Sequence, residues 1–256
     1  MFVCGGRRDF VSDEPAEEYV RHALGSRGGD IEVGLARQLG ELARELHSKP
    51  DMEALLQQIT KAAVDEIDGA EHACISLVEG QIVRTHAATD DMVARVDQRE
   101  SELKEGPCIT SLRTEVTVRS DDFETEERWP RFVAAAMQEG IRSMLAVQLF
   151  VVGDNLGALN IYATRRNAFT EHDESVAMLL AIHAAIAMRG HKVESNLRVA
   201  LGSRDVIGQA KGILMERYKI SEAEAFHLLV IASQKTHRKL RVVAETLATT
   251  GDLGVL

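Results

Sequence analysis

Two pairs of apolar, strand-like segments constrain the fold of this chain more than any other feature. The segment "HACISLVEGQIVRTHAAT" and the later "SMLAVQLFVVGDNLGALNIYAT" each contain two such runs, separated by the turn residues Glu79-Gly80 and Gly153-Asp154-Asn155. Helical periodicity precedes the first pair after Pro50-Asp51, and a further helix is expected from about Thr170. The order of helix, hairpin, irregular middle, hairpin and helix predicts an α+β domain in which helices cover one face of an antiparallel sheet.

Length and hydropathy suggest two domains outside a membrane. A chain of 256 residues with 45% hydrophobic residues can bury one sizeable core and a smaller second one. The most apolar window, "SVAMLLAIHAAIAM", contains His183 and stops before the roughly 18 residues expected of a membrane span. Arg7-Arg8 is not followed by the apolar core of a signal peptide. We therefore expect a cytoplasmic protein without a membrane partner.

Cysteine and histidine usage does not indicate a metal site. The three cysteines are Cys4, Cys74 and Cys108, without C-x-x-C spacing, and the nine histidines form no H-E-x-x-H motif. Cys108, after Gly-Pro, is either a redox reporter near a pocket or a small buried hydrophobe. Trp129, before Pro130 at an expected helix start, either walls such a pocket or anchors the structure. No catalytic motif is present, so no catalytic residue is predicted.

Two leucine-rich periodicities predict a homodimer. Residues 1–30 lack hydrophobic periodicity and are expected to form a flexible arm, whereas residues 31–50 form a helix with a narrow seam of Leu35, Leu39, Leu42 and Leu46. That seam suits pairing with another helix, or packing onto its own domain. A connecting helix over residues 171–203 continues a similar rhythm through Val176, Leu179, His183, Ile186, Val193, Leu197 and Leu201. Two copies of each helix are expected to form a coiled-coil-like dimer bundle.

Charge is distributed unevenly along the chain. The net charge is -10, yet residues 196–256 carry nine Lys and Arg against six Asp and Glu, which gives +3 and leaves -13 elsewhere. This tail predicts three short amphipathic helices, the second beginning at a capping box of Ser221 and Glu224 with Phe226 on its apolar side. The third buries Leu240, Val243, Ala244 and Leu247, so the cations near it are expected to form one exposed stripe on the last helix. Such a stripe suits a phosphate backbone or an acidic protein partner.

Residues 51–188 resemble the GAF family of small sensory domains. The resemblance is carried by "EGPCITSL", "RWPRFVAAAMQEGIRSMLAVQL" and "LGALNIYATRRNAFTEHD" in this order. It implies a GAF-type antiparallel sheet flanked by helices and an unknown small-molecule ligand. The N-K-x-x-F-D-E motif of cyclic-nucleotide binders is missing and nothing marks a haem attachment point, so the resemblance does not name the signal. Free methionine sulfoxide reductases share the domain type but use several cysteines, and a non-enzymatic chain is expected.

Residues 197–251 resemble the ANTAR domain. The motifs "SRDVIGQAKGILMERY", "SEAEAFHLL" and "SQKTHRKLRVVAETL" carry this resemblance, which implies a dimeric three-helix bundle that binds paired hairpins in nascent RNA and prevents termination. The RNA contacts that it implies are Ser233, Gln234, His237, Arg238, Lys239 and Arg241, with Lys211 as a weaker choice. The family usually has Asn at the place of His237, basic residues near Val230 and Ile231, and an acidic residue near Val242.

Together these features predict a signal-responsive transcription antitermination regulator. Two alternatives remain open at this point. One is a DNA-binding regulator whose last helix enters a major groove. The other is a protein-interaction module whose cations meet an acidic partner.

Overall fold

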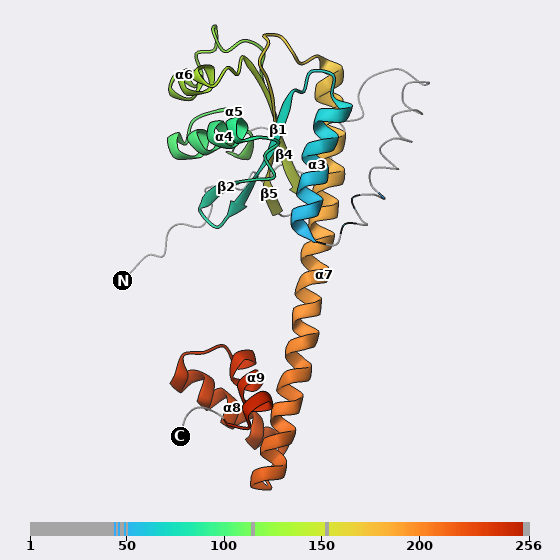
Figure 1. The fold of residues 1–256 in the computed structure, drawn as a ribbon, viewed down its shortest axis with the longest axis vertical. Coiled ribbons are helices and arrows are strands. Elements are labelled where there is room, and N and C mark those ends of the chain that lie inside the picture. The colour runs from blue at the N-terminus through green and yellow to red at the C-terminus, as the bar shows by residue number, and fades with distance from the viewer. Residues whose placement is uncertain are drawn as a thin grey trace, which may run out of the picture. The chain divides into compact units, whose positions relative to one another are not determined.

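The computed structural model describes residues 44, 46, 49, 51–113, 116–151 and 154–252. The chain divides into two compact units, Met1–His191 and Lys192–Leu256, which are described separately (Figure 1). The predicted flexible arm and Leu35, Leu39 and Leu42 of the predicted seam lie outside the described residues.

The first unit contains an antiparallel sheet of five strands in the order β2-β1-β5-β4-β3. Its strands are β1 (His72–Glu79), β2 (Ile82–His86), β3 (Thr117–Ser120), β4 (Ser143–Val151) and β5 (Asp154–Ala163). Both predicted hairpins are confirmed, because β1 pairs with β2 and β4 pairs with β5. Gly80 adopts a φ of 69° in the first turn, a left-handed conformation that glycine reaches without steric cost.

Helices cover both faces of this sheet, so the prediction of one covered face was wrong. One face carries α3 (Met52–Glu66) and the start of α7 (Glu171–Tyr218). The other carries α4 (Asp91–Leu103), α5 (Pro107–Arg113) and α6 (Pro130–Gln138), which replace much of the predicted irregular middle (Figure 1). The physical reason lies in the central strands, since β4 and β5 are buried at nearly every position and therefore need cover on both sides.

Two hydrophobic clusters result from this layering. Leu145 and Val147 point into the first cluster, which lies beneath α3 and α7. Met144 and Ala146 point into the second cluster, which lies beneath α4, α5 and α6. Leu46, the one residue of the predicted leucine seam that is described, is fully buried in the first cluster. This leucine therefore packs onto its own domain, which is the alternative that the sequence left open.

A close approach of two strands fixes the centre of the sheet. Gly157 of β5 pairs with Leu77 of β1 and has a φ of 153°. A Cβ atom at this position would lie 2.0 Å from the carbonyl oxygen of Ser76. Only glycine fits here, so Gly157 serves the contact between β1 and β5.

Helix α7 runs without interruption for 48 residues, from Glu171 to Tyr218. The sequence predicted a connecting helix that ends at residue 203 and a separate helix after it, and this separation was wrong. Glycines at positions 190, 202, 208 and 212 each weaken a helix by about 0.5–1 kcal/mol relative to alanine but do not break it as proline does.

Helix α7 also corrects the expectation that no segment approaches a membrane span. An 18-residue window in it has a mean hydropathy of 1.3, so by length and composition alone this helix is long and apolar enough to cross a membrane. Half of that window is buried inside the protein, as in the core helix of a globular domain.

The second unit consists of the C-terminal part of α7, α8 (Glu222–Thr236) and α9 (Leu240–Thr250). Its core comprises Ala210, Leu214, Ala225, Leu229, Ala232, Val243, Ala244 and Leu247. The predicted capping box is confirmed, because the Ser221 hydroxyl accepts from the Glu224 amide and the Glu224 carboxylate accepts from the Ser221 amide. Phe226 was wrongly assigned to the apolar side, since 43% of it is exposed.

Candidate functional site

Four exposed cations of the second unit surround the turn between α8 and α9. This basic corner consists of Lys235 on α8, Arg238 and Lys239 in the turn, and Arg241 on α9. The predicted stripe along the last helix was therefore wrong, because α9 begins only at Leu240 and carries one of the four. The predicted inward side of α9 is confirmed, with Val243, Ala244 and Leu247 fully buried.

The turn itself is built by local hydrogen bonds. His237 ends α8 in the left-handed region with a φ of 52°, and the Arg238 amide donates to the Ser233 carbonyl oxygen at 3.2 Å. The Ser233 hydroxyl donates to the Arg238 carbonyl oxygen at 2.6 Å. Asn tolerates the left-handed region better than most residues, which gives the family's usual Asn at position 237 a conformational reason.

The predicted RNA contacts divide into two groups in the structure. Gln234, His237 and Lys239 are exposed at the corner, whereas Ser233 is engaged in the turn. Arg238 Nη2 donates to Thr246 Oγ1 at 3.0 Å, and Arg241 Nη1 lies 3.4 Å from Glu245 Oε1. These contacts hold both guanidinium groups along α9 while leaving them accessible to solvent.

Lys211 occupies a different environment. Its ammonium group forms an ion pair with Glu222 at the start of α8, and 22% of its side chain is exposed. The structure thus gives Lys211 a contact within the bundle, between α7 and α8.

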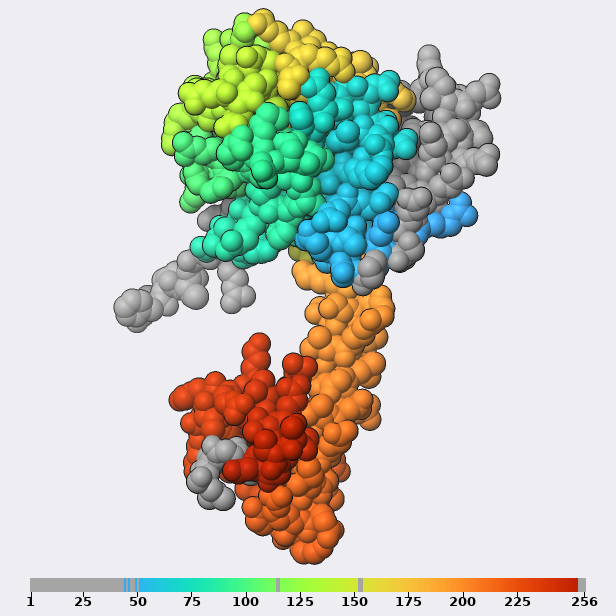
Figure 2. Space-filling model, viewed as in Figure 1, coloured from blue at the N-terminus to red at the C-terminus, as the bar shows by residue number. Residues whose placement is uncertain are grey.

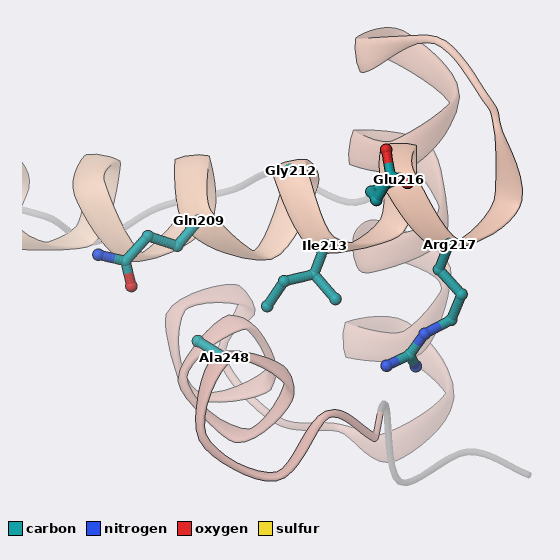
Figure 3. Close-up of a pocket in the computed structure, with 6 residues that line it drawn as sticks. All are labelled: Gln209, Gly212, Ile213, Glu216, Arg217 and Ala248. Carbon is teal, nitrogen blue, oxygen red and sulfur yellow. The ribbon is translucent and has the colours of Figure 1, made fainter.

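An open hollow of about 820 Å³ lies between α7 and α9 of the second unit (Figure 3). It is lined by Gln209, Gly212, Ile213, Glu216, Arg217 and Ala248. Arg217 Nη1 donates to the Gly251 carbonyl oxygen at 2.6 Å, which fastens the end of α9 to α7. The hollow carries charges of both signs and is wide open, so it does not resemble an enclosed ligand pocket.

A buried polar network occupies the second cluster of the first unit. Asp97 of α4 is fully buried and accepts hydrogen bonds from four side chains. Its donors are the Ser76 hydroxyl at 2.7 Å, the Thr85 hydroxyl at 2.6 Å, the Asn160 amide at 2.7 Å and the Tyr162 hydroxyl at 3.3 Å. Strands β1, β2 and β5 are thereby tied to α4 through one carboxylate.

Glu100 lies one turn further along α4 and is 1% exposed. Its Oε1 accepts from the Cys108 amide at 2.6 Å, at the start of α5. Burial, together with the neighbouring Asp97 carboxylate, raises the pKa of Glu100 well above its usual range. The loop wraps closely around this carboxyl group, because a Cβ atom at Gly106 would lie 2.3 Å from Glu100 Oε1.

Cys108 and Trp129, the predicted sensor residues, both belong to this second cluster. The Cys108 thiol is 1% exposed, and burial, Glu100 and Asp97 raise its pKa well above the usual range. This environment favours the thiol over the nucleophilic thiolate. Trp129 precedes α6 and donates from Nε1 to Thr110 Oγ1 at 3.0 Å, while Arg128 stacks on its ring at 4.1 Å. It therefore joins α5 to α6.

Sequence reasoning missed Asp97 and Glu100 because it sought apolar periodicity. On α4, Val93, Val96, Asp97 and Glu100 recur at the spacing of one helical face, and all four are buried. Two of these positions are carboxylates, so the segment resembled a polar loop. A search for helical spacing that disregards charge would have found the helix.

Comparisons with known families agree with the two units. A GAF domain model matches residues 49–189, which is more than half of the chain, and an ANTAR domain model matches residues 195–247. The first match implies a sensing domain and the second implies RNA-binding antitermination. A comparison with curated proteins gives no match.

Solved structures share the fold at low sequence identity. Free methionine-R-sulfoxide reductase from Neisseria meningitidis, in complex with its substrate, is similar with a TM-score of 0.50 and 16% identity, covering 68% of this chain and 99% of that chain. The phytochrome photosensory core module of Stigmatella aurantiaca has a TM-score of 0.56 and 9% identity, covering 86% of this chain and 47% of that one. Such identities show the fold alone. With its family match over residues 49–189 and the further match over residues 195–247, the chain belongs to the GAF domain family and carries an ANTAR domain after its GAF domain.

Proposed function

We propose that this chain is a homodimeric, signal-responsive transcription antitermination regulator of the cytoplasm, whose ANTAR domain binds paired hairpins in nascent RNA. The observation that carries the proposal is the basic corner of Lys235, Arg238, Lys239 and Arg241, in a chain whose net charge is -10. Clustered cations on an acidic protein attract a polyanion to one place while the rest of the surface repels it.

The form of the corner favours RNA over duplex DNA. A helix that reads a major groove presents several side chains along its outer face. On α9 the outward residues include Arg241 and Glu245, and a carboxylate there opposes entry between two phosphate backbones. Exposed Gln234 and His237 lie at the turn, where they can hydrogen-bond or stack on unpaired loop bases.

The exposed face of α7 supports the homodimer. Ile186, Val193, Leu197 and Leu201 recur at helical spacing and are between 52% and 58% exposed. The stretch of α7 that carries them is drawn in orange in Figure 2. A row of large apolar side chains in water favours burial against another helix, and a second copy presents the same row. This row, defined as the α7 seam, is the main support for the dimer, because Leu46 packs onto its own domain and Leu35, Leu39 and Leu42 of the predicted seam lie outside the described residues.

The sensing role follows from the GAF domain, and we propose an unidentified small molecule as its signal. The signal would act on the ANTAR domain through α7, because that helix belongs to both domains. No catalytic step is proposed for either domain.

Direct binding measurements test the proposal. The full chain is titrated, at physiological salt, into an RNA with two short hairpins, into the same RNA with one hairpin opened, and into duplex DNA of matched length. We expect the tightest binding to the paired hairpins. Tighter binding to the duplex would instead favour the DNA-binding regulator. Binding to neither nucleic acid by a dimer would favour the interaction module.

A further inference from the structure

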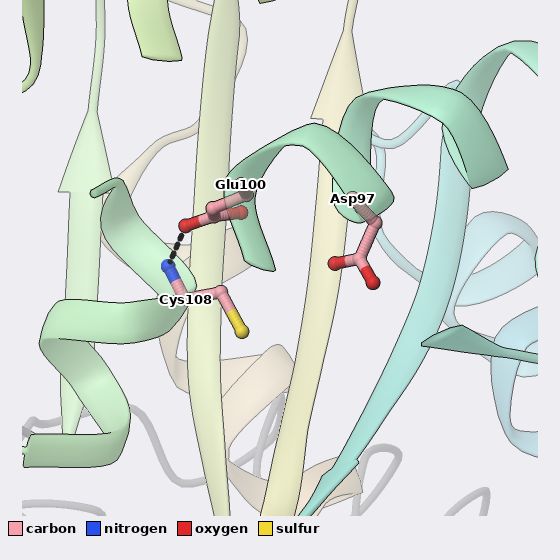
Figure 4. A group of neighbouring side chains, drawn as sticks. All are labelled: Asp97, Glu100 and Cys108. Carbon is pink, nitrogen blue, oxygen red and sulfur yellow. Dashed lines mark hydrogen bonds between the residues drawn. The ribbon is translucent and has the colours of Figure 1, made fainter. Parts of the chain in front are cut away.

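Three potential metal ligands meet in the second cluster of the GAF domain. Asp97 and Glu100 of α4 and Cys108 of α5 each offer a ligand atom, and these atoms lie within 4.8 Å of one another (Figure 4). All three side chains are at most 1% exposed. Ligand atoms 4.8 Å apart around a tetrahedral ion would each lie about 2.9 Å from the ion. Shortening each ion-to-ligand distance by less than about 1 Å gives the distances usual for zinc.

Among the described residues, two buried oxygen atoms of this polar network have no hydrogen-bond partner. Glu100 Oε2 is unpaired although Oε1 of the same carboxyl group accepts from the Cys108 amide. Asn160 Oδ1 is also unpaired, and its amide group contacts Asp97 and interacts with the Cys108 thiol. Buried polar atoms are nearly always paired, so the orphaned oxygen on Glu100, one of the three candidate ligands, points to a missing partner.

The charge of the cluster points to a cation. Within the described part of the chain, neither Asp97 nor Glu100 forms an ion pair, and the donors to Asp97 are neutral side chains. Two buried carboxyl groups without a positive partner are costly in a low-dielectric interior. A proton on Glu100 or a bound cation would each relieve this charge, but only a cation would also coordinate the Cys108 sulfur.

We propose that Asp97, Glu100 and Cys108 form a buried site for a divalent transition-metal ion of the zinc class. Two carboxylate oxygens and one thiolate suit such an ion, whereas the thiolate disfavours magnesium and calcium, which take oxygen ligands. A bound metal ion keeps a coordinating cysteine deprotonated even in surroundings that otherwise favour the thiol. The sequence predicted no metal because these ligands follow no standard spacing.

The site couples helices α4 and α5 to strand β5, so occupancy would alter the second cluster of the sensor. The competing explanation is purely structural: Glu100 caps the start of α5 through its bond to the Cys108 amide. The two explanations differ for Glu100→Gln, since the amide oxygen still accepts that hydrogen bond while the negative charge is lost.

Metal binding to the purified full chain, stripped with a chelator, tests the site. Cobalt(II) is titrated with and without competing zinc, and thiolate-to-cobalt charge transfer is followed by absorption. We expect one ion per chain and an affinity lowered more than about 100-fold in Cys108→Ala, because loss of even an outer-shell partner costs about 10- to 100-fold. Glu100→Gln should also bind more weakly while remaining folded by circular dichroism.

Cys74→Ala provides the matched control. Cys74 is equally buried in the same cluster but is not among the three ligands. This variant should keep both the stoichiometry and the charge-transfer band. Wild-type protein that binds cobalt or zinc no more tightly than Cys108→Ala overturns the proposal, as does a band that survives in Cys108→Ala.

Discussion

Removing charge from the basic corner gives the sharpest test of the RNA interface. The corner holds four exposed cations, and each neutralised phosphate contributes about -0.7 to -0.9 to the slope of log K against log salt. If all four contact phosphates, one corner contributes a slope of about -3 to -4, and the two corners of a dimer contribute twice that. Arg238→Ala with Arg241→Ala should therefore halve the slope measured for the paired-hairpin RNA.

Folding should survive this double substitution. Arg241→Ala removes an exposed ion pair to Glu245, which is worth about 0.3–0.5 kcal/mol on a helix. Arg238→Ala removes one exposed hydrogen bond to Thr246, worth about 0.5–1.5 kcal/mol. The summed cost stays below about 2 kcal/mol, and circular dichroism should report an unchanged helix content.

A matched control separates local contacts from net charge. Arg198 and Lys219 are 77% and 74% exposed and lie outside the corner. Arg198→Ala with Lys219→Asn removes the same charge, and Asn suits the left-handed φ of 57° at position 219. The reasoning is refuted if this control flattens the slope as much as the corner variant does, or if the corner variant leaves the slope unchanged.

Three further predictions concern assembly and stability. Leu197→Glu should dissociate the dimer, as measured by sedimentation, whereas Val199→Glu should not. Both residues are exposed on α7, but only Leu197 lies in the α7 seam, so equal effects would contradict that seam. Gly157→Ala should destabilise the GAF domain by more than about 3 kcal/mol in denaturant unfolding, because its Cβ would lie 2.0 Å from a backbone oxygen; a cost below 1 kcal/mol would contradict the close approach. Burial alone would raise the pKa of Glu126, but hydrogen bonds from Arg128 lower it to about 2. The interaction of ionised Glu126 with Arg128 stabilises the fold by about 1–2 kcal/mol after screening of the half-exposed arginine. This stabilisation is present above about pH 4.5 and is lost toward pH 2. Glu126→Gln should remove that part of the dependence of unfolding free energy on pH, and an unchanged pH profile would argue against the interaction.

The sequence by itself determined the features that depend on neighbouring residues. The turn at Gly80 and the capping box at Ser221 were predicted because turn and cap chemistry act within about four residues. The buried side of α9 was likewise legible from its spacing. The order of the two domains followed from family motifs, which are also local.

Tertiary structure alone decided what depends on distant partners. Asp97 and Glu100 could not be assigned to a core, because carboxylates are buried only where other elements supply donors. The donors to Asp97 lie on β1, β2 and β5, and the donor to Glu100 lies at the start of α5. The continuity of α7 was equally hidden, since glycine weakens a helix without fixing where it ends. The place of Arg238 and Lys239 is an exception, because it depended on a local feature that the sequence reasoning overlooked. The αL turn at His237 moved the start of α9 to Leu240 and turned an expected stripe into a corner. Local chemistry thus defined the helix caps, the turns and the basic corner, whereas contacts between distant elements defined the buried polar network of Asp97 and Glu100.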